Sequence, residues 1–216
     1  KMTVQSYGAE LVEKEAIIEG ESNGNIRIVA GGEVYEVIYL LVCTGSETVI
    51  PPIKGLSELD YWTSKEALES TSLPQSLTII GGGVIGMEFA SFYNSMGVKV
   101  SVIEMMPEIL GAMDKETSAM LRTEYQKRGI KFYLGSKVTE VGGAGVTIEK
   151  EGKSSVVAAD KILVSVGRKA NINKVGLDKL NIELLRNGVK VDEHMQTSHP
   201  RVYACGDITG HSMLAH

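Results

Sequence analysis

Residues 77–134 constrain the fold of this chain most strongly, because strand-like and helix-like stretches alternate along them. The apolar run Leu77–Ile80 leads directly into the glycine string 81–83. The expected elements are a strand at 77–80, a helix at 84–96 closed by Gly97, a strand at 99–104, a helix at 114–128 closed by Gly129 and a strand at 130–134. This β-α-β-α-β order predicts an α/β fold built on a parallel, doubly wound sheet.

The glycine string has the spacing of a phosphate-binding turn. Gly81, Gly83 and Gly86 fit the pattern G-x-G-x-x-G, with a strand before them and a helix after them. In such a turn the first glycine permits the bend, the second lets the backbone approach a pyrophosphate, and the third lets the helix pack closely on the strand. The spacing predicts a nucleotide at the helix N-terminus, where free N–H groups favour an anion. A glycine-rich turn without a ligand is the alternative.

Two acidic residues follow the glycines. Glu104 ends the next strand, 18 residues beyond Gly86, where a carboxylate accepts hydrogen bonds from ribose hydroxyls and repels a 2′-phosphate. Since residues 105–113 contain no arginine to bind that phosphate, the pattern predicts NAD over NADP. Glu88 lies near the helix N-terminus, where an acid is favourable in any case, and a role at the cofactor would need a cation that the sequence does not identify.

The rest of the chain shows one internal similarity. Short strands divided by glycines, followed by an apolar strand that ends in glycine, occur at residues 10–45 and again at 138–167. Only the second instance has a β-α-β unit before it, so we expect two related domains of which the first lacks its front part; chance similarity of two meanders is the alternative. The remaining expected elements are strands at 10–19, 25–30, 34–43, 138–141, 146–150, 156–158, 162–166 and 202–205, helices at 65–69 and 177–180, and hairpin turns at 23–24 and 187–188.

Composition and charge exclude several classes of protein. The net charge is −5 with acids and bases interspersed, which argues against a nucleic-acid protein and against a polybasic membrane anchor. No apolar run is long enough to cross a bilayer, and no apolar secretory segment opens the chain, so we expect no membrane span and a cytoplasmic protein. Cys43 and Cys205 have neither zinc nor redox spacing, His211 and His216 are wrongly spaced for one helix face, and no metal site is expected.

At this point the motifs resemble a known family, the flavin-dependent pyridine-nucleotide disulfide oxidoreductases. The resemblance rests on segments that occur in the family's order, namely 42-VCTGS-46, 81-GGGVIGME-88, Glu104, 162-ILVSVGR-168 and 203-YACGD-207. The tail Met213–His216 resembles the branch of the family that oxidises dihydrolipoamide to lipoamide with NAD+, through FAD and a redox disulfide. The resemblance implies a Rossmann-like fold with a parallel sheet and an antiparallel β-meander, in which a complete NAD domain is flanked by pieces of an FAD domain.

The resemblance also implies roles for individual residues. It divides the chain into a partial FAD-binding domain at 1–52, the NAD-binding domain at 53–170, and a connection with the C-terminal part of the FAD domain at 171–216. The implied NAD contacts are Gly81, Gly82, Gly83, Val84, Ile85, Gly86, Met87, Glu88, Glu104, Val138, Gly167 and Arg168. The implied FAD contacts are Ala16, Thr44, Gly45, Ser46, Asp207, Met213, Leu214, Ala215 and His216, with Glu88 also approaching the flavin. Arg168 is equally suited to a surface salt bridge.

Departures from the family qualify the expected activity. The FAD phosphate loop, the redox-active cysteine pair and the C-terminal interface domain with its His–Glu base are not in this sequence, so the chain is expected to be an internal fragment, inactive by itself. The parent would be a homodimer that oxidises dihydrolipoamide carried by a 2-oxo acid dehydrogenase or glycine cleavage complex, in the cytoplasm or, in a eukaryote, the mitochondrial matrix. A sister NADH-dependent disulfide or mercuric reductase and a non-catalytic NAD-binding module are the alternatives.

Overall fold

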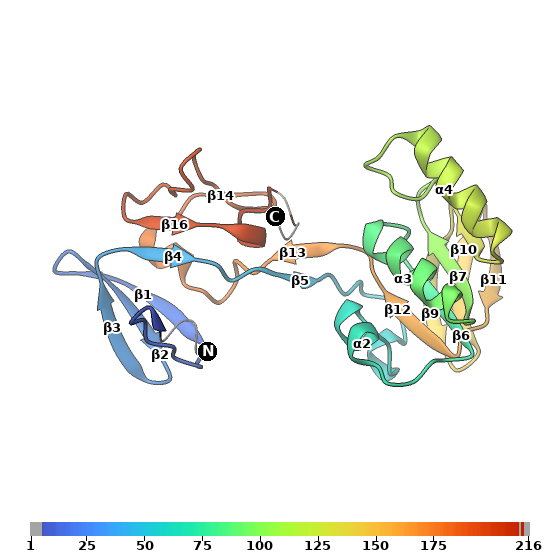
Figure 1. Ribbon diagram of the computed structural model, residues 1–216, viewed down its shortest axis with the longest axis horizontal. Helices are drawn as coiled ribbons and strands as arrows, with labels where there is room; N and C mark the ends of the chain where they lie inside the picture. Colours follow the sequence, from blue (N-terminus) through green and yellow to red (C-terminus); the bar gives the residue numbers. More distant parts are fainter. Residues whose placement is uncertain (1–5, 212, 214–216) are drawn as a thin grey trace. The chain divides into compact units, whose positions relative to one another are not determined.

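A computed structural model describes residues 6–211 and 213 of the chain. The chain forms two compact units (Figure 1). The central unit comprises residues 48–168, and the flanking unit comprises residues 1–47 together with 169–216.

The central unit is built on a four-stranded parallel sheet. Its strands lie in the order β12-β6-β7-β8, with bounds Lys161–Val164, Ser76–Ile80, Lys99–Glu104 and Lys131–Leu134. Strand β6 comes first along the chain and pairs with β12 on one edge and with β7 on the other. Its residues from 77 to 80 are mostly apolar and all buried, so both faces of the strand are covered, as is typical of a parallel sheet packed between other layers. The predicted β-α-β-α-β unit and the α/β class are therefore confirmed.

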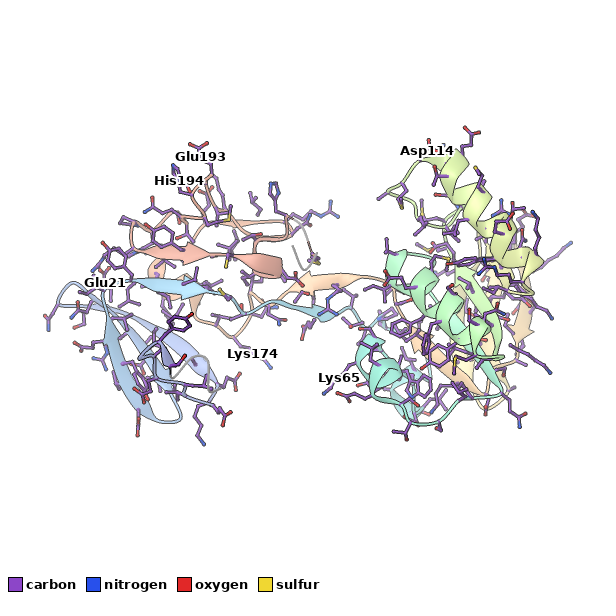
Figure 2. The ribbon with its side chains drawn as sticks, in the orientation of Figure 1. Glu21, Lys65, Asp114, Lys174, Glu193 and His194 are labelled. Carbon is purple, nitrogen blue, oxygen red and sulfur yellow. The ribbon has the colours of Figure 1, made fainter. Side chains whose placement is uncertain are left out.

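Three helices complete the parallel part of this unit. They are α2 (Ser64–Glu69), α3 (Val84–Ser95) and α4 (Lys115–Lys127). The glycines predicted to close α3 and α4 do so with positive φ, 85° at Gly97 and 92° at Gly129. Asp114 caps α4 by accepting a hydrogen bond from the amide of Thr117, and Figure 2 shows it at the start of that helix.

The cap of α2 corrects the sequence-based expectation by one residue. Thr63, not Ser64, is the N-cap, and it forms a capping box with Glu66. The Glu66 carboxylate accepts hydrogen bonds from the hydroxyl and the amide of Thr63, which lowers its pKa. Thr63 and Ser64 both carry a hydroxyl group and both stand at the start of the predicted helix. Only the reciprocal contact between Thr63 and Glu66 shows which of the two is the cap.

An antiparallel meander packs beside the parallel sheet. Its order is β11-β10-β9, with bounds Lys153–Val157, Gly145–Lys150 and Lys137–Gly142. The sequence predicted this meander, although β11 begins three residues before the expected start at 156. Side chains of the meander share a buried apolar cluster with β6, β7, β12 and the short 3-10 helix η1 (Leu56–Glu58). A second cluster lies between the sheet and the helices and includes Tyr93, Trp62 and Ile79.

The flanking unit holds a second three-stranded meander, of order β1-β2-β3. These strands are Ala16–Ser22, Asn25–Ala30 and Glu33–Val37, and the predicted turn Asn23-Gly24 joins the first two. The expected start of the first strand at residue 10 was wrong by six positions, since residues 10–15 pair with no strand among the described residues.

The expected long strand at 34–43 was also wrong. It is two strands, β3, which pairs antiparallel with β2, and β4 (Leu40–Val42), which pairs parallel with β16 (Val202–Ala204). Ile38 and Tyr39 lie between them with more than half of their surface exposed. The sequence shows one apolar run there, but a single straight strand cannot serve two sheets, so the run breaks where its partner changes.

Short elements complete the flanking unit. They are β5 (Ser46–Thr48) paired with β13 (Arg168–Ala170), the hairpin of β14 (Leu184–Leu185) and β15 (Gly188–Val189), and the 3-10 helices η2 (Leu177–Leu180) and η3 (Gly206–Thr209). Apolar side chains of β13, β15, η2 and η3 join those of β1, β2, β4 and β16 in one buried cluster. No described helix has the length and apolar character of a membrane span.

Candidate nucleotide-binding site

Two glycines of the 81–86 turn are required by close backbone contacts. Gly81 has a φ of +112°, and a Cβ there would lie 2.5 Å from the carbonyl oxygen of Ser165. At Gly86 a Cβ would lie 2.3 Å from the carbonyl oxygen of Gly81 and 2.8 Å from the Ser165 hydroxyl. These are the roles expected of the first and third glycines, the bend and the close packing of α3 on β6.

Gly83 is different, because nothing lies near its missing side chain. A Cβ at this position would meet no atom within 4 Å, and its φ of −76° is ordinary for any residue. Gly83 is also the N-cap of α3, whose first N–H groups have no partner within the helix. Neither packing nor backbone strain therefore requires a glycine here, and the space beside the helix N-terminus is open to a group that would approach the backbone.

Glu104 lies at the end of β7 against this turn. Its two carboxylate oxygens accept hydrogen bonds from the amides of Gly82, at 2.6 Å, and of Met106, at 2.7 Å. The side chain is half-buried, and two backbone donors hold its carboxylate in one orientation. Since a carboxylate has about four acceptor positions, the positions that remain can accept ribose hydroxyls.

The loop after β7 is tied to the glycine turn as well. Leu110 donates its amide to the carbonyl of Gly82 at 2.8 Å. In the same loop Glu108 holds the Arg122 guanidinium through bonds of 2.8 Å and 3.0 Å. Arg122 holds the pKa of the Glu108 carboxyl below its usual range. The arginine on α4 is thus bound to a carboxylate of this loop.

Ser165 is a residue that sequence reasoning missed. It follows β12, is buried, and its hydroxyl lies 3.3 Å from the carbonyls of both Ile80 and Gly81. Its amide donates to the carbonyl of Ile80 at 2.9 Å. Ser165 therefore holds the end of β6 in place from the neighbouring strand. The available signal in the sequence was a serine directly after an apolar strand and two residues before Gly167.

Glu88 is exposed on α3, beside a hollow between α2 and α3. The hollow has a volume of about 580 Å³ and is lined mainly by apolar side chains, among them Leu68, Phe92 and Met96. No cation lies within ion-pair distance of Glu88 among the described residues. The structure thus leaves its expected partner unidentified, as the sequence did.

Other residues implied in NAD binding lie at strand ends or in the meander. Gly167 has a φ of +122°, follows β12, and accepts the amide of Val49 at 3.0 Å. Arg168 contacts the hydroxyl of Thr48. Val138 is half-buried on β9 and packs against the meander cluster.

Four of the residues implied in FAD binding lie just after β4 and β16 in the flanking unit, namely Thr44, Gly45, Ser46 and Asp207. The Ser46 hydroxyl donates to the Asp207 carboxylate at 2.5 Å, and the Thr44 hydroxyl donates to the carbonyl of Asn171 at 3.0 Å. Asn171 returns bonds to the carbonyls of Thr44 and Gly45. Ala16 is exposed at the start of β1, Met213 is half-buried, and Leu214, Ala215 and His216 lie outside the described residues.

Comparison with known proteins gives the family. Residues 2–216 match the family described as pyridine nucleotide-disulphide oxidoreductase. A dihydrolipoyl dehydrogenase of Acholeplasma laidlawii is 38% identical over 96% of this chain and 64% of its own length. Dihydrolipoyl dehydrogenases of Rhizobium etli and Pseudomonas aeruginosa are 36% and 34% identical, over 46% of their lengths. The chain thus spans between about half and two thirds of these relatives.

Solved structures agree with the sequence comparison. LpdA of Mycobacterium tuberculosis superposes with a TM-score of 0.85 at 26% identity, over 99% of this chain and 49% of that protein. The HOCl-induced flavoprotein disulfide reductase RclA of Escherichia coli superposes with a TM-score of 0.84 at 25% identity, over 95% of this chain and 47% of that protein. The glycine turn, the sheet topology and these likenesses together show that the chain belongs to the pyridine nucleotide-disulphide oxidoreductase family.

Proposed function

We propose that this chain is the NAD-binding part of a dihydrolipoamide dehydrogenase, with part of that enzyme's FAD site. The observation that carries the proposal is Gly83, which stands open at the N-terminus of α3 between two glycines that packing requires. The identities of 34–38% to three dihydrolipoyl dehydrogenases support that substrate class within the family.

In this proposal the central unit binds and orients the dinucleotide. The N–H groups of the first turn of α3 bind the pyrophosphate, and Gly83 lets it approach. Glu104, already oriented by the amides of Gly82 and Met106, accepts the adenosine ribose hydroxyls and repels a 2′-phosphate. NAD+ supplies the hydride acceptor when bound, while the protein supplies position and electrostatics. Val138, Gly167 and Arg168 are proposed contacts further along the cofactor.

The flanking unit would supply one side of the flavin site. Ser46 binds one oxygen of Asp207, and the carboxylate retains capacity to accept a hydroxyl of the ribityl chain. Thr44, Gly45, Met213 and the residues after it are proposed flavin contacts. The full enzyme would be a cytoplasmic homodimer acting on dihydrolipoamide held by a 2-oxo acid dehydrogenase or glycine cleavage complex. The 216 residues contain no closely spaced cysteine pair, so we expect no dihydrolipoamide oxidation from them alone.

A sister flavoprotein disulfide reductase is the second candidate, and the likeness to RclA favours it. The sequence of RclA is 25% identical to this chain, whereas the dihydrolipoyl dehydrogenase of Acholeplasma laidlawii is 38% identical to it. The first candidate therefore has the stronger support.

The first test is a calorimetric titration of the purified chain with NADH and, separately, NADPH. We expect binding of NADH and weaker binding of NADPH, because of Glu104. Gly83→Ala should lower the unfolding temperature only slightly, since the new methyl group meets no atom and alanine is a poorer N-cap than glycine. It should lower NADH affinity by about tenfold or more, equivalent to about 1.4 kcal/mol, because the methyl group occupies the phosphate approach.

Gly143→Ala is the matched control. This glycine is exposed, its Cβ would also meet no atom within 4 Å, and it lies in the β9–β10 turn. The Gly143→Ala variant should bind NADH with the affinity of the wild type. Equal loss in both variants, or no loss at Gly83, would contradict the phosphate site. Stronger binding of NADPH than NADH would contradict the role of Glu104 and point to a sister reductase.

A further inference from the structure

The two cysteines of the chain, 162 positions apart, meet in the flanking unit. Cys43 directly follows β4, and Cys205 directly follows β16. The parallel register of these strands pairs Val42 with Ala204, so the cysteines are the next residues across from each other. Their Sγ atoms lie 3.3 Å apart, and both thiols are free. Neither belongs to the family motif for the redox disulfide, and neither has a role in the proposed function.

The backbone at this place suits a disulfide. Neighbouring strands lie about 4.7–4.9 Å apart, inside the range of about 4.4–6.8 Å over which disulfides join Cα atoms. The amide of Cys205 donates to the carbonyl of Val42 at 3.2 Å, so the two strand ends are still hydrogen-bonded where the cysteines stand. Closing the bond requires the sulfurs to approach from 3.3 Å to about 2.05 Å, a movement of side chains.

Neither a purely structural role nor a metal site accounts for the two thiols as well. A cysteine often serves as a small buried apolar residue, but Cys43 is exposed and Cys205 is only half-buried. A metal site would need further ligands, and the described residues contain no group of three or more cysteine, histidine, aspartate or glutamate side chains that could hold an ion. With these two roles set aside, the remaining interpretation is a pair of accessible thiols in contact, which oxidation can join in a disulfide.

We propose that Cys43 and Cys205 are a reversible dithiol–disulfide site, oxidised by hydrogen peroxide or by a small-molecule disulfide. With peroxide, the thiolate of one cysteine attacks one peroxide oxygen and the O–O bond breaks. This cysteine becomes a sulfenic acid, and the departing hydroxide takes up the proton that the thiol had released, which gives one water. The second thiol then displaces hydroxide from that sulfur, so the disulfide and a second water result and peroxide has received two electrons. A dithiol reductant reverses the reaction by thiol–disulfide exchange.

The chemistry of Cys43 sets the conditions of the test. Desolvation, followed by the hydrogen bond to Cys205, raises the pKa of the Cys43 thiol. The reactive thiolate is therefore scarce at neutral pH, and oxidation is expected to proceed faster in mildly alkaline buffer.

The experiment is a thiol count on the whole chain, which has two cysteines in total. The reduced protein is treated with hydrogen peroxide at mildly alkaline pH, denatured and titrated with Ellman's reagent. We expect both thiols to disappear together, the protein to remain a monomer on a non-reducing gel, and the intact mass to fall by about 2 Da. Dithiothreitol should restore both thiols, and a non-reducing digest should contain one peptide pair joined through Cys43 and Cys205.

Cys43→Ser and Cys205→Ser are the matched controls. Each keeps one thiol that cannot close a ring, so each should gain oxygen, react with the sulfenic-acid probe dimedone, or form a disulfide-linked dimer. The proposal is overturned if the wild type behaves like the single variants, by gaining oxygen on separate cysteines or by forming dimers. The digest of the wild type decides the matter even if a serine variant fails to fold, and none of these readouts depends on nucleotide binding.

Discussion

The two units of this chain share a local pattern and differ in what completes it. Each has a three-stranded antiparallel meander followed by a strand that ends near a glycine with positive φ, β12 before Gly167 and β4 before Gly45. In the central unit that strand joins β6, β7 and β8 in a four-stranded sheet. In the flanking unit it pairs with β16 in a sheet of two.

This difference shows what the glycine turn of the central unit has in addition to a strand and a glycine. The central unit has a strand, β6, whose end turns through Gly81–Gly86 into a helix, and neighbours on both sides hold that turn through Ser165 and Glu104. Among the described residues of the flanking unit, no strand leads through a glycine turn into an α-helix; β16 leads only into the short 3-10 helix η3. The meander and the final strand recur in both units, but among the described residues the glycine turn that we propose to bind phosphate occurs in one.

Hydrogen exchange should show the largest difference between the units. The bonded amides of Leu40 and Cys205 belong to a two-stranded sheet, and no other described strand pairs with β4. We expect them to exchange at least about a hundredfold faster than the amides of β6, because local opening of a small sheet costs less free energy. Equal protection would show that the free edge of β4 is covered. A disulfide between Cys43 and Cys205 would join the ends of β4 and β16, so oxidation should reduce the difference in exchange rate between these amides and those of β6.

A matched pair of glycine substitutions should destabilise one unit each. A Cβ at Gly86 would lie 2.3 Å from the carbonyl oxygen of Gly81, and one at Gly188 would lie 2.4 Å from that of Ile208. Each alanine variant should lose about 1–3 kcal/mol of unfolding free energy through overpacking. Exchange measured by mass spectrometry should place the Gly86→Ala effect in residues 48–168 and the Gly188→Ala effect in the flanking unit. Effects spread evenly over both units would show that they unfold together.

Ser165→Ala should have a smaller effect, confined to the central unit. The change removes a buried hydroxyl that lies 3.3 Å from the carbonyls of Ile80 and Gly81. We expect a loss of about 1 kcal/mol in denaturant unfolding, together with weaker NADH binding because the glycine turn loses a support. Ser165→Thr, which keeps the hydroxyl, is the comparison variant. An unchanged NADH affinity in the alanine variant would show that the turn holds its shape without this contact.

The Glu108–Arg122 pair should give the smallest effect, and a pH-dependent one. The pKa of Glu108 is lowered in the folded chain, chiefly by Arg122, so the pair stabilises above the ordinary carboxyl pKa of about 4.3. That stability is lost as pH falls through the lowered value. Glu108→Gln should cost up to about 1 kcal/mol at pH 7 and nothing well below pH 4. Glu124→Gln, which removes an exposed pair with Lys127, should show no measurable change at either pH.

Most of the central unit could be predicted from the sequence, because its signals are local. The apolar run at 77–80, the glycine spacing at 81–86 and Glu104 at the end of the next strand each act within a few residues of their own position. Where the backbone has a positive φ or approaches another segment closely, the sequence usually has glycine, and this residue choice can be recognised from the sequence. The α/β class, the parallel sheet and the antiparallel meander were predicted and are confirmed on that basis.

Tertiary structure decided what depends on distant partners. The apolar run at 34–43 became two strands because β2 and β16 lie on different sheets, and β16 is about 160 residues further along the chain. The same pairing of β4 with β16 brought Cys43 against Cys205, and the pairing of β12 with β6 brought Ser165 onto the glycine turn. Such contacts leave no periodicity in the sequence, since strand pairing selects residues by register in space rather than by spacing along the chain.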